Sequence, residues 1–284
     1  MQEATEGNYI DPVLRIKKAT GHILARLHQG NQAEIYQELL SQELQSLQDH
    51  YGFSIELGPT KEDANYDLQT TPLNPITAYE GVVTIAQELQ KYPSNYIQKC
   101  AIKKLILVAS LQQNGNHWGG VTLPDGILYV TVYPNNTDDN TSIIHHELEH
   151  QATNAYSQDK TTTVFEIRGK TLRRTTYHDL AWEQIHKKSG IRYSQEKWQQ
   201  RDSLDGFARR YGAKNHLEDQ ATIMELLMTN PLDLQARCFT DPILGQKVTR
   251  MILELKRRTN GTMDKQYFED LIGKITQDKE FNEY

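Results

Sequence analysis

The feature that most constrains this chain is residues 146–150, which read His-Glu-Leu-Glu-His within a stretch of helical character. On an α-helix, residues four apart lie on one face, so His146 and His150 point their imidazole rings toward the same place. Ile144 and Leu148 are also four apart, and they give the helix an apolar face that has to be buried. The fold must therefore bury one face of this helix and keep the histidine face available to a metal ion.

Glu147 follows the first histidine, close to where a metal would bind but outside its coordination shell. A carboxylate in that position accepts a proton from metal-bound water, which is why H-E-x-x-H is typical of hydrolytic zinc sites. The motif predicts Zn²⁺ bound by His146 and His150, with Glu147 as general base. The alternative is a chance match on a solvated, histidine-rich helix. His145 lies about 100° around the helix from His146, so we expect it beside the site or facing solvent.

A catalytic zinc usually has three protein ligands and a fourth position for water, so one more ligand is required. A metzincin would carry glycine and histidine at positions where this chain has Thr153 and Tyr156. The third ligand must therefore come from a more distant part of the chain.

Further along, the chain resembles the gluzincin metallopeptidases, and more narrowly the anthrax lethal factor-like and related secreted bacterial zinc peptidases. Those families place a tyrosine seven residues before a ligand glutamate in an E-[DF]-x-A context. The residues that match are Tyr211, Glu218, Asp219 and Ala221. The resemblance covers residues 104–228. It implies that Glu218 is the third zinc ligand and that Tyr211 hydrogen-bonds the oxyanion or the departing group.

Other interpretations of these residues remain open. Glu218 also fits a helix N-terminus in which Asn215 is the cap and Glu218 reaches back to it. Residues 261–267 resemble the G-T-x-D-x-x-Y motif of aspzincins, which would make Asp264 the ligand, although a helix cap at Thr262 explains the same residues. Asp219 or Glu225 could orient a ligand imidazole. Lesser metal-ligand candidates are His178, Asp179, His186 and His216.

The secondary-structure pattern predicts an α+β fold. Residues 104–111, 119–123 and 127–133 are expected to be strands, because they are rich in β-branched and apolar residues bounded by turn residues. The resemblance implies a zincin-like arrangement, with a small mixed sheet, an edge strand above the H-E-x-x-H helix and a mainly helical C-terminal part. Residues 1–95 are expected to form a helical region or subdomain, and residues 96–284 the zincin-like metallopeptidase domain.

The expected edge strand also suggests how a substrate binds. Gly119, Gly120 and Val121 begin it, and an extended peptide could add to this strand as a further β-strand. Glycines at these positions would allow its backbone to approach closely.

Helix boundaries follow from caps and breakers. Residues 13–47 are expected to form two helices with a break at Gly30, and residues 58–75 a loop. Thr77 and Glu80 form a capping box for the next helix. Asp241 before a proline caps another.

Composition excludes some partners. The formal net charge of −6 and the isoelectric point near 5.9 provide no general basic field for nucleic acid or an anionic membrane. The longest apolar run, residues 105–109, is too short to span a bilayer. Cys100 and Cys238 either pair or stay apart as thiols. No signal peptide is visible in the acidic, polar opening, which is what a mature secreted or cell-envelope protein would show, and a cytoplasmic location stays open.

The sequence therefore predicts a zinc-dependent endopeptidase acting on peptides or proteins, with the oligomeric state left open. Glu147 would activate zinc-bound water and return the proton to the leaving amine. The first alternative is a zinc-binding protein without turnover, either a scaffold domain or an inactivated peptidase. The second is zinc-assisted hydrolysis of a bond other than a peptide bond.

Overall fold

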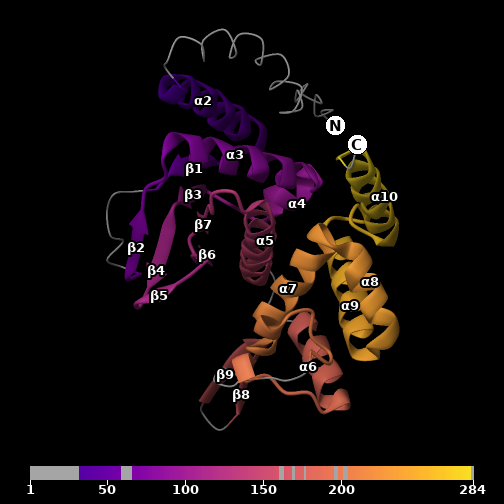
Figure 1. Ribbon diagram of the computed structural model, residues 1–284. Helices are drawn as coiled ribbons and strands as arrows, with labels where there is room; N and C mark the ends of the chain where they lie inside the picture. Colours follow the sequence, from indigo (N-terminus) through magenta and orange to yellow (C-terminus); the bar gives the residue numbers. More distant parts are fainter. Residues whose placement is uncertain are drawn as a thin grey trace, which may run out of the picture. The chain divides into compact units, whose positions relative to one another are not determined.

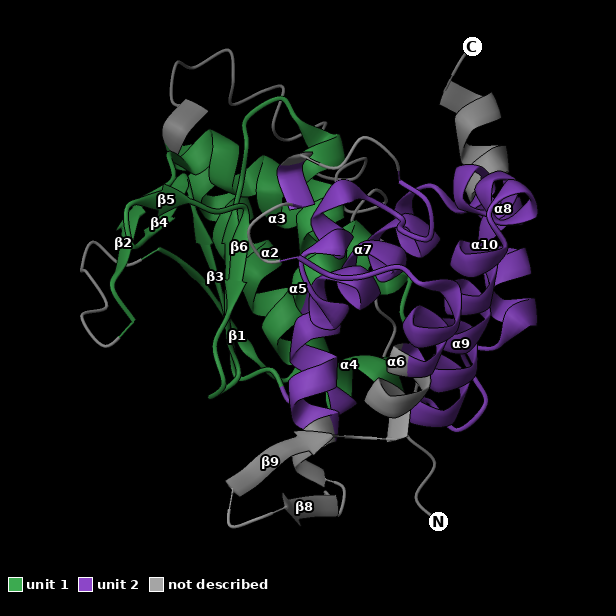
Figure 2. Cartoon of the chain, turned by 90° about the horizontal axis from the view of Figure 1, so that it is seen from below, with its two compact units in different colours: residues 1–98, 102–147 green, residues 99–101, 148–284 purple. Residues whose placement is uncertain are grey.

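Helix α5 (Thr137–Asp159) carries the motif and runs through both of the units into which the chain divides. Unit 1 comprises residues 1–98 and 102–147, and unit 2 comprises residues 99–101 and 148–284 (Figure 2). The structure, a computed structural model, describes residues 32–58, 66–159, 163–167, 170–175, 177–194, 198–200 and 204–282.

The main sheet of unit 1 has four strands in the order β1-β3-β7-β6 (Figure 1). They are β1 (Ser54–Leu57), β3 (Lys104–Val108), β7 (Ile127–Thr131) and β6 (Gly120–Thr122). Strands β1, β3 and β7 are parallel, whereas β6 runs antiparallel to β7, with Val121 opposite Tyr129. The sheet is therefore mixed, and β6 stands at one end of the strand order.

A second sheet in unit 1 is antiparallel, in the order β2-β4-β5. Its strands are β2 (Leu68–Thr71), β4 (Ser110–Gln113) and β5 (Asn116–His117). The expected strand over residues 104–111 is in fact divided between the two sheets, because the backbone N–H of Ala109 bonds the carbonyl of Thr71. The two sheets share one apolar core: Leu68, Ile106, Val108, Leu111, Leu123 and Tyr129.

The helices among the described residues of unit 1 are α2 (Gln32–Tyr51), α3 (Pro75–Gln90), α4 (Ser94–Lys99) and the first part of α5. Figure 1 shows α2 lying along α3. Helix α3 approaches the sheet closely at Gly81, where a Cβ would lie 2.5 Å from a methyl group of Val132. The cap of α3 is Asn74, which accepts from the N–H of Thr77, so the predicted cap at Thr77 is wrong by one turn.

The division of the chain differs from the expected boundary near residue 95. Strand β1 pairs with β3, and β2 pairs with β4, so segments on both sides of that boundary form the same sheets. The expected loop over residues 58–75 also contains β2. Four residues with one buried side chain, Leu68, are too short for their period to show in the sequence.

Unit 2 is mainly helical in its described residues. Its helices after α5 are α6 (Tyr177–Ser189), η1 (Trp198–Gln200), η2 (Arg210–Ala213), α7 (His216–Thr229), α8 (Pro231–Thr240), α9 (Pro242–Arg258) and α10 (Lys265–Asn282). Strands β8 (Thr163–Ile167) and β9 (Lys170–Thr175) form an antiparallel pair. Every side chain of α7 from Glu218 to Met228 is buried. This helix is therefore the centre of the unit.

Other sequence expectations have definite outcomes. Asp241 caps α9 as predicted, accepting from the N–H groups of Ile243 and Leu244. Helix α2 begins the described part of the chain at Gln32, and residues 13–31, with the break expected at Gly30, lie outside it. Cys100 and Cys238 do not form a disulfide with each other. Within the described part of the chain, no helix has the length and apolar character needed to cross a membrane.

Candidate metal centre

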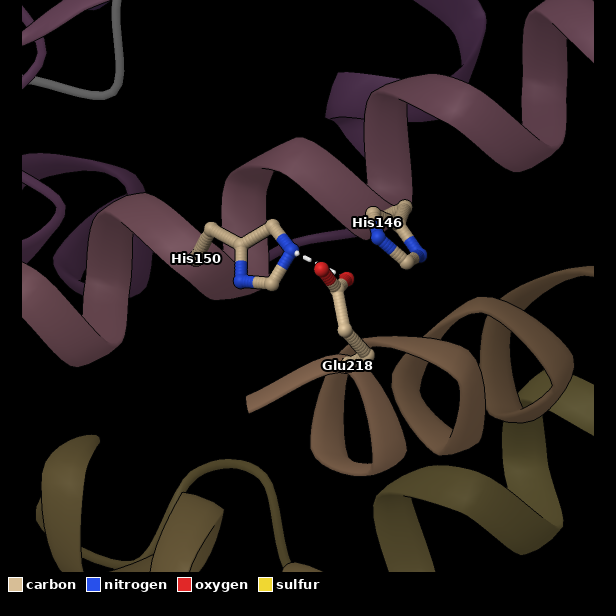
Figure 3. A group of neighbouring side chains, drawn as sticks. All are labelled: His146, His150 and Glu218. Carbon is tan, nitrogen blue, oxygen red and sulfur yellow. Dashed lines mark hydrogen bonds and ion pairs between the residues drawn. The ribbon is translucent and has the colours of Figure 1, made fainter. Parts of the chain in front are cut away.

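Helices α5 and α7 bring His146, His150 and Glu218 together (Figure 3). One ligand atom of each residue lies within 4.8 Å of the other two. The Nε2 atom of His150 is 3.0 Å from Oε2 of Glu218. His146 lies one turn earlier on the continuous helix α5, as the i, i+4 spacing predicts. The two histidines of the motif and the downstream glutamate are thus brought to one place.

The first turn of α7 sets the position of Glu218. Asn215 caps this helix, accepting from the N–H groups of Leu217 and Glu218. The Glu218 carboxylate is directed to His150 instead of back to the helix N-terminus. The predicted cap is therefore formed by Asn215, and Glu218 is available as a ligand.

Tyr211 and Lys214 hold the other oxygen of the Glu218 carboxylate. The Tyr211 hydroxyl donates to Oε1 at 3.1 Å, and the Lys214 ammonium donates to the same atom at 3.2 Å. The seven-residue spacing of Tyr211 and Glu218 thus does bring these side chains together. Gly212 makes this possible, since a Cβ there would lie 2.7 Å from Oγ1 of Thr222 and 3.2 Å from Cα of Asp219.

Glu147 is buried against strand β6, with 5% of its surface exposed. The Thr122 hydroxyl lies 2.7 Å from Oε2 of Glu147, to which it can donate, and 3.1 Å from the Glu147 carbonyl oxygen. A Cβ at Gly120 would lie 2.5 Å from Cγ of Glu147. Strand β6 therefore fixes the Glu147 carboxylate through the Thr122 hydroxyl, and the absence of a side chain at Gly120 leaves space for it.

The expected substrate strand is only partly as anticipated. Strand β6 begins at Gly120, whereas Gly119 precedes it, and a Cβ at Gly119 would lie 2.9 Å from Cδ1 of Ile143. Val121 packs against the apolar core of unit 1, so it faces away from Glu147. Successive side chains of a strand alternate between faces, which places Gly120 and Thr122 on the Glu147 side.

His145 does not face solvent, because it is fully buried. Its Nδ1 lies 2.7 Å from the Tyr92 hydroxyl, and its Nε2 lies 2.7 Å from Oε2 of Glu88. Burial tends to raise the pKa of Glu88, but the hydrogen bond and charge of His145, followed by Lys91, hold this pKa below its ordinary value. His145 thus anchors the motif helix to α3.

Asp219 forms a buried network away from the ligand histidines. Its Oδ2 accepts from Trp182 Nε1 at 3.0 Å, Tyr193 Oη at 2.8 Å and Lys247 Nζ at 2.6 Å. The sequence suggests that Asp219 orients a ligand imidazole, but these hydrogen bonds are made to other residues. They tie the start of α7 to α6 and α9.

The remaining candidates have other partners. Asp264 caps α10 by accepting from the N–H groups of Gln266 and Tyr267, and it lies 3.5 Å from the Lys256 ammonium. The cap is thus Asp264 itself and not Thr262. Glu225 pairs with Arg209.

Two of the lesser candidates also have described surroundings. His186 Nδ1 lies 3.2 Å from the Ile191 carbonyl oxygen, and Nε2 lies 3.5 Å from Asp219. His216 is the first residue of α7. The side chains of His178 and Asp179 lie outside the described residues.

Two residues of this centre carry no sequence prediction. Thr122 could have been found from the two-residue period of β6, since it shares a face with Gly120. Lys214 lies four residues before Glu218, a spacing that brings side chains together across a helical turn. Its second contact, with Tyr211, depends on the turn between η2 and α7.

Comparison with known proteins shows the fold. No family model matches the chain, and no curated protein sequence matches it. A crystal structure from Bacteroides caccae, which bears the provisional name of a zinc-binding metallo-peptidase, has the same fold with a TM-score of 0.58. The two are 17% identical in sequence, and the match covers 86% of this chain and 94% of the other.

Proposed function

We propose that this protein is a zinc-dependent endopeptidase of the gluzincin type, with His146, His150 and Glu218 as the zinc ligands. The observation that carries the proposal is that one ligand atom of each of these residues lies within 4.8 Å of the others, and that the helix of the two histidines, α5, also bears Glu147. The fold shared with a structure provisionally named as a metallo-peptidase supports it.

The donor set fits zinc. Two imidazole nitrogens and one carboxylate oxygen are ligands that Zn²⁺ prefers, and three protein ligands are typical of catalytic rather than structural sites. Zinc held there would polarise the scissile carbonyl and make a water molecule acidic enough to lose a proton near neutral pH.

Glu147 is the general base in this proposal. Its carboxylate accepts the proton of the attacking water and then delivers that proton to the leaving amine. The Thr122 hydroxyl bonds Oε2 of Glu147, which fixes the direction of the carboxylate. A base with a fixed orientation loses less entropy on reaching the transition state.

Tyr211 and strand β6 would act on the substrate. The Tyr211 hydroxyl lies at the Glu218 carboxylate, where a phenol could donate to a developing oxyanion. Among the described strands, β6 is at one end of its sheet, so its outer edge could pair with an extended peptide. This pairing would set the register of the substrate without specifying its side chains.

A second candidate function is zinc binding without turnover. The buried Glu147, held by Thr122, favours the enzyme, because a structural zinc site has no use for a general base. Digestion of a mixed peptide library by the zinc-loaded protein separates the two, with cleavage expected. Zinc binding with no cleavage of any peptide would favour the second candidate.

The ligand assignment predicts a contrast between two carboxylates. Glu218→Ala should weaken zinc binding by about 100-fold or more, because one of three ligand groups is lost. Asp264→Ala should leave zinc affinity unchanged, since that side chain caps α10 and pairs with Lys256. Chelator competition measures both. The opposite pattern would support the aspzincin assignment.

The space at Gly120 predicts a specific loss of catalysis. In Gly120→Ala the new Cβ would lie 2.5 Å from Cγ of Glu147, so the carboxylate must move by about 1 Å. Such a displacement of a catalytic group costs on the order of 100-fold in turnover. Zinc content should not change.

The matched control is Gly273→Ala on helix α10, where a Cβ meets nothing within 4 Å. We expect full activity from this variant. Normal turnover by Gly120→Ala would show that Glu147 is not confined by β6.

A further inference from the structure

The Oε1 atom of Glu218 accepts hydrogen bonds from two side chains of different chemistry. One donor is the Tyr211 hydroxyl at 3.1 Å, and the other is the Lys214 ammonium at 3.2 Å. The ammonium also donates to the Tyr211 oxygen at 3.1 Å and lies 4.8 Å from the centre of its ring. The three side chains thus form a closed triangle.

The backbone of unit 2 brings this triangle together locally. Lys214 follows η2 directly and immediately precedes the cap of α7, so it lies three residues after Tyr211 and four before Glu218. Its side chain is 20% exposed and that of Glu218 is 12% exposed. The hydrogen bonds are therefore shielded from water more than those of an ordinary surface ion pair.

The two donors differ in how many hydrogen bonds they can give. A tyrosine hydroxyl has one hydrogen, whereas a lysine ammonium has three. Tyr211 cannot donate to Glu218 and to a substrate oxygen at the same time. Lys214 can keep its bond to Glu218 whatever Tyr211 does.

We infer that Lys214 is a positioning residue that holds the Glu218 carboxylate when the Tyr211 hydroxyl turns to a substrate. With Lys214 in place, the turning of Tyr211 leaves Oε1 of Glu218 still bonded. The ligand carboxylate then keeps its orientation throughout the reaction. The inference rests on the proposed function for the role of Tyr211, but the sharing of Glu218 between two donors is a property of the chain alone.

Zinc affinity provides a test that needs no enzymatic activity. Chelator competition with Zn²⁺ is measured for the native protein, Tyr211→Phe, Lys214→Met and the double variant. Each single variant retains one donor, so we expect affinity within about 3-fold of native, whereas losing both outer partners of a ligand typically costs about 10- to 100-fold. Lys214→Met also removes a positive charge near the ion. This effect cancels in the double-variant cycle, because it is present both in the native background and in the Tyr211→Phe background.

Two results would overturn the inference. Single-variant effects that simply multiply in the double variant would show that the donors act independently. A loss in Lys214→Met as large as in the double variant would show that Tyr211 holds nothing. Lys214→Gln keeps an N–H donor without the charge. Combined with Tyr211→Phe, it should therefore retain a higher zinc affinity than Lys214→Met in the same combination.

Turnover of a cleaved library peptide gives the second part of the test. Lys214→Met should lower kcat with little change in KM, and this loss should persist in the Tyr211→Phe background, because Lys214 acts directly on Glu218 and not through Tyr211. If the native protein cleaves no peptide, the proposed function is refuted. The zinc affinities of the four proteins would still show whether Tyr211 and Lys214 share the Glu218 carboxylate. A kcat loss that disappears in the Tyr211→Phe background would refute the role assigned to Lys214.

Discussion

Replacing Glu147 with glutamine will abolish peptide hydrolysis while leaving zinc bound. The amide keeps the size of the side chain and can still interact with Thr122, but it cannot accept a proton from water at neutral pH. General-base catalysis typically contributes about 10²- to 10⁴-fold, so turnover should fall by at least that range. The measurements are cleavage of a quenched fluorescent peptide library and metal content by atomic absorption.

A control for this substitution exists in the same unit. Glu56 lies on β1, where its half-exposed carboxylate pairs with Lys104 at 2.7 Å. Glu56→Gln removes a charge of the same kind and should keep full activity. Hydrolysis retained by Glu147→Gln would refute the general-base assignment, and loss of zinc would point to a structural defect instead.

The largest effect on stability is expected at Lys247. Its ammonium is fully buried and donates to Oδ2 of Asp219 at 2.6 Å, and it lies 4.0 Å from the centre of the Phe207 ring. Lys247→Met leaves the Asp219 carboxylate buried without its cation, although Trp182 and Tyr193 still donate to it. Breaking one side of a buried ion pair typically costs about 3–5 kcal/mol.

Urea unfolding, together with amide hydrogen exchange in α7 and α9, measures this loss in unit 2 itself. Lys256→Met is the matched control, because Lys256 is on the same helix but is 53% exposed and lies 3.5 Å from Asp264. Exposed ion pairs contribute about 0–1 kcal/mol, so the control should unfold almost as the native protein does. Equal stability of the two variants would show that the Lys247–Asp219 pair does not hold unit 2 together.

The motif itself could be placed from the sequence with little ambiguity. The i, i+4 spacing of His146 and His150 fixes their common face wherever the helix packs. The position of Glu218 needed more than periodicity. The resemblance in the spacing of Tyr211 and Glu218 indicates this position, and the fold brings these two side chains within 3.1 Å of each other.

Other residues could not be placed because their roles depend on what packs against them. A helical wheel gives the direction of His145 but not the presence of Glu88, whose segment lies far away in the sequence. Asp219 follows Glu218 directly, and only the packing of α6 and α9 shows that it bonds Trp182 and Lys247. The contact of Thr122 with Glu147 depends on how β6 packs against α5, which the sequence does not show.

The fold shows the same limit. Parallel pairing of β1 with β3 joins segments about fifty residues apart, and a four-residue strand carries too little periodicity to reveal such a partner. Segments on both sides of residue 95 therefore share sheets whose pairing the sequence does not predict. Local signals did better, since the Asp241 side chain caps α9 as its sequence context predicts.

The burial of His145 determines how an inactive allele of this protein should be built. Replacing both His145 and His146 with alanine would remove a proposed zinc ligand and, in the same step, leave the Glu88 carboxylate in the core without the imidazole that lies 2.7 Å from it. Low abundance in cells would then be mistaken for lost chemistry. A genetic study should therefore rely on Glu147→Gln as its knockout and treat His145→Ala as a probe of protein turnover.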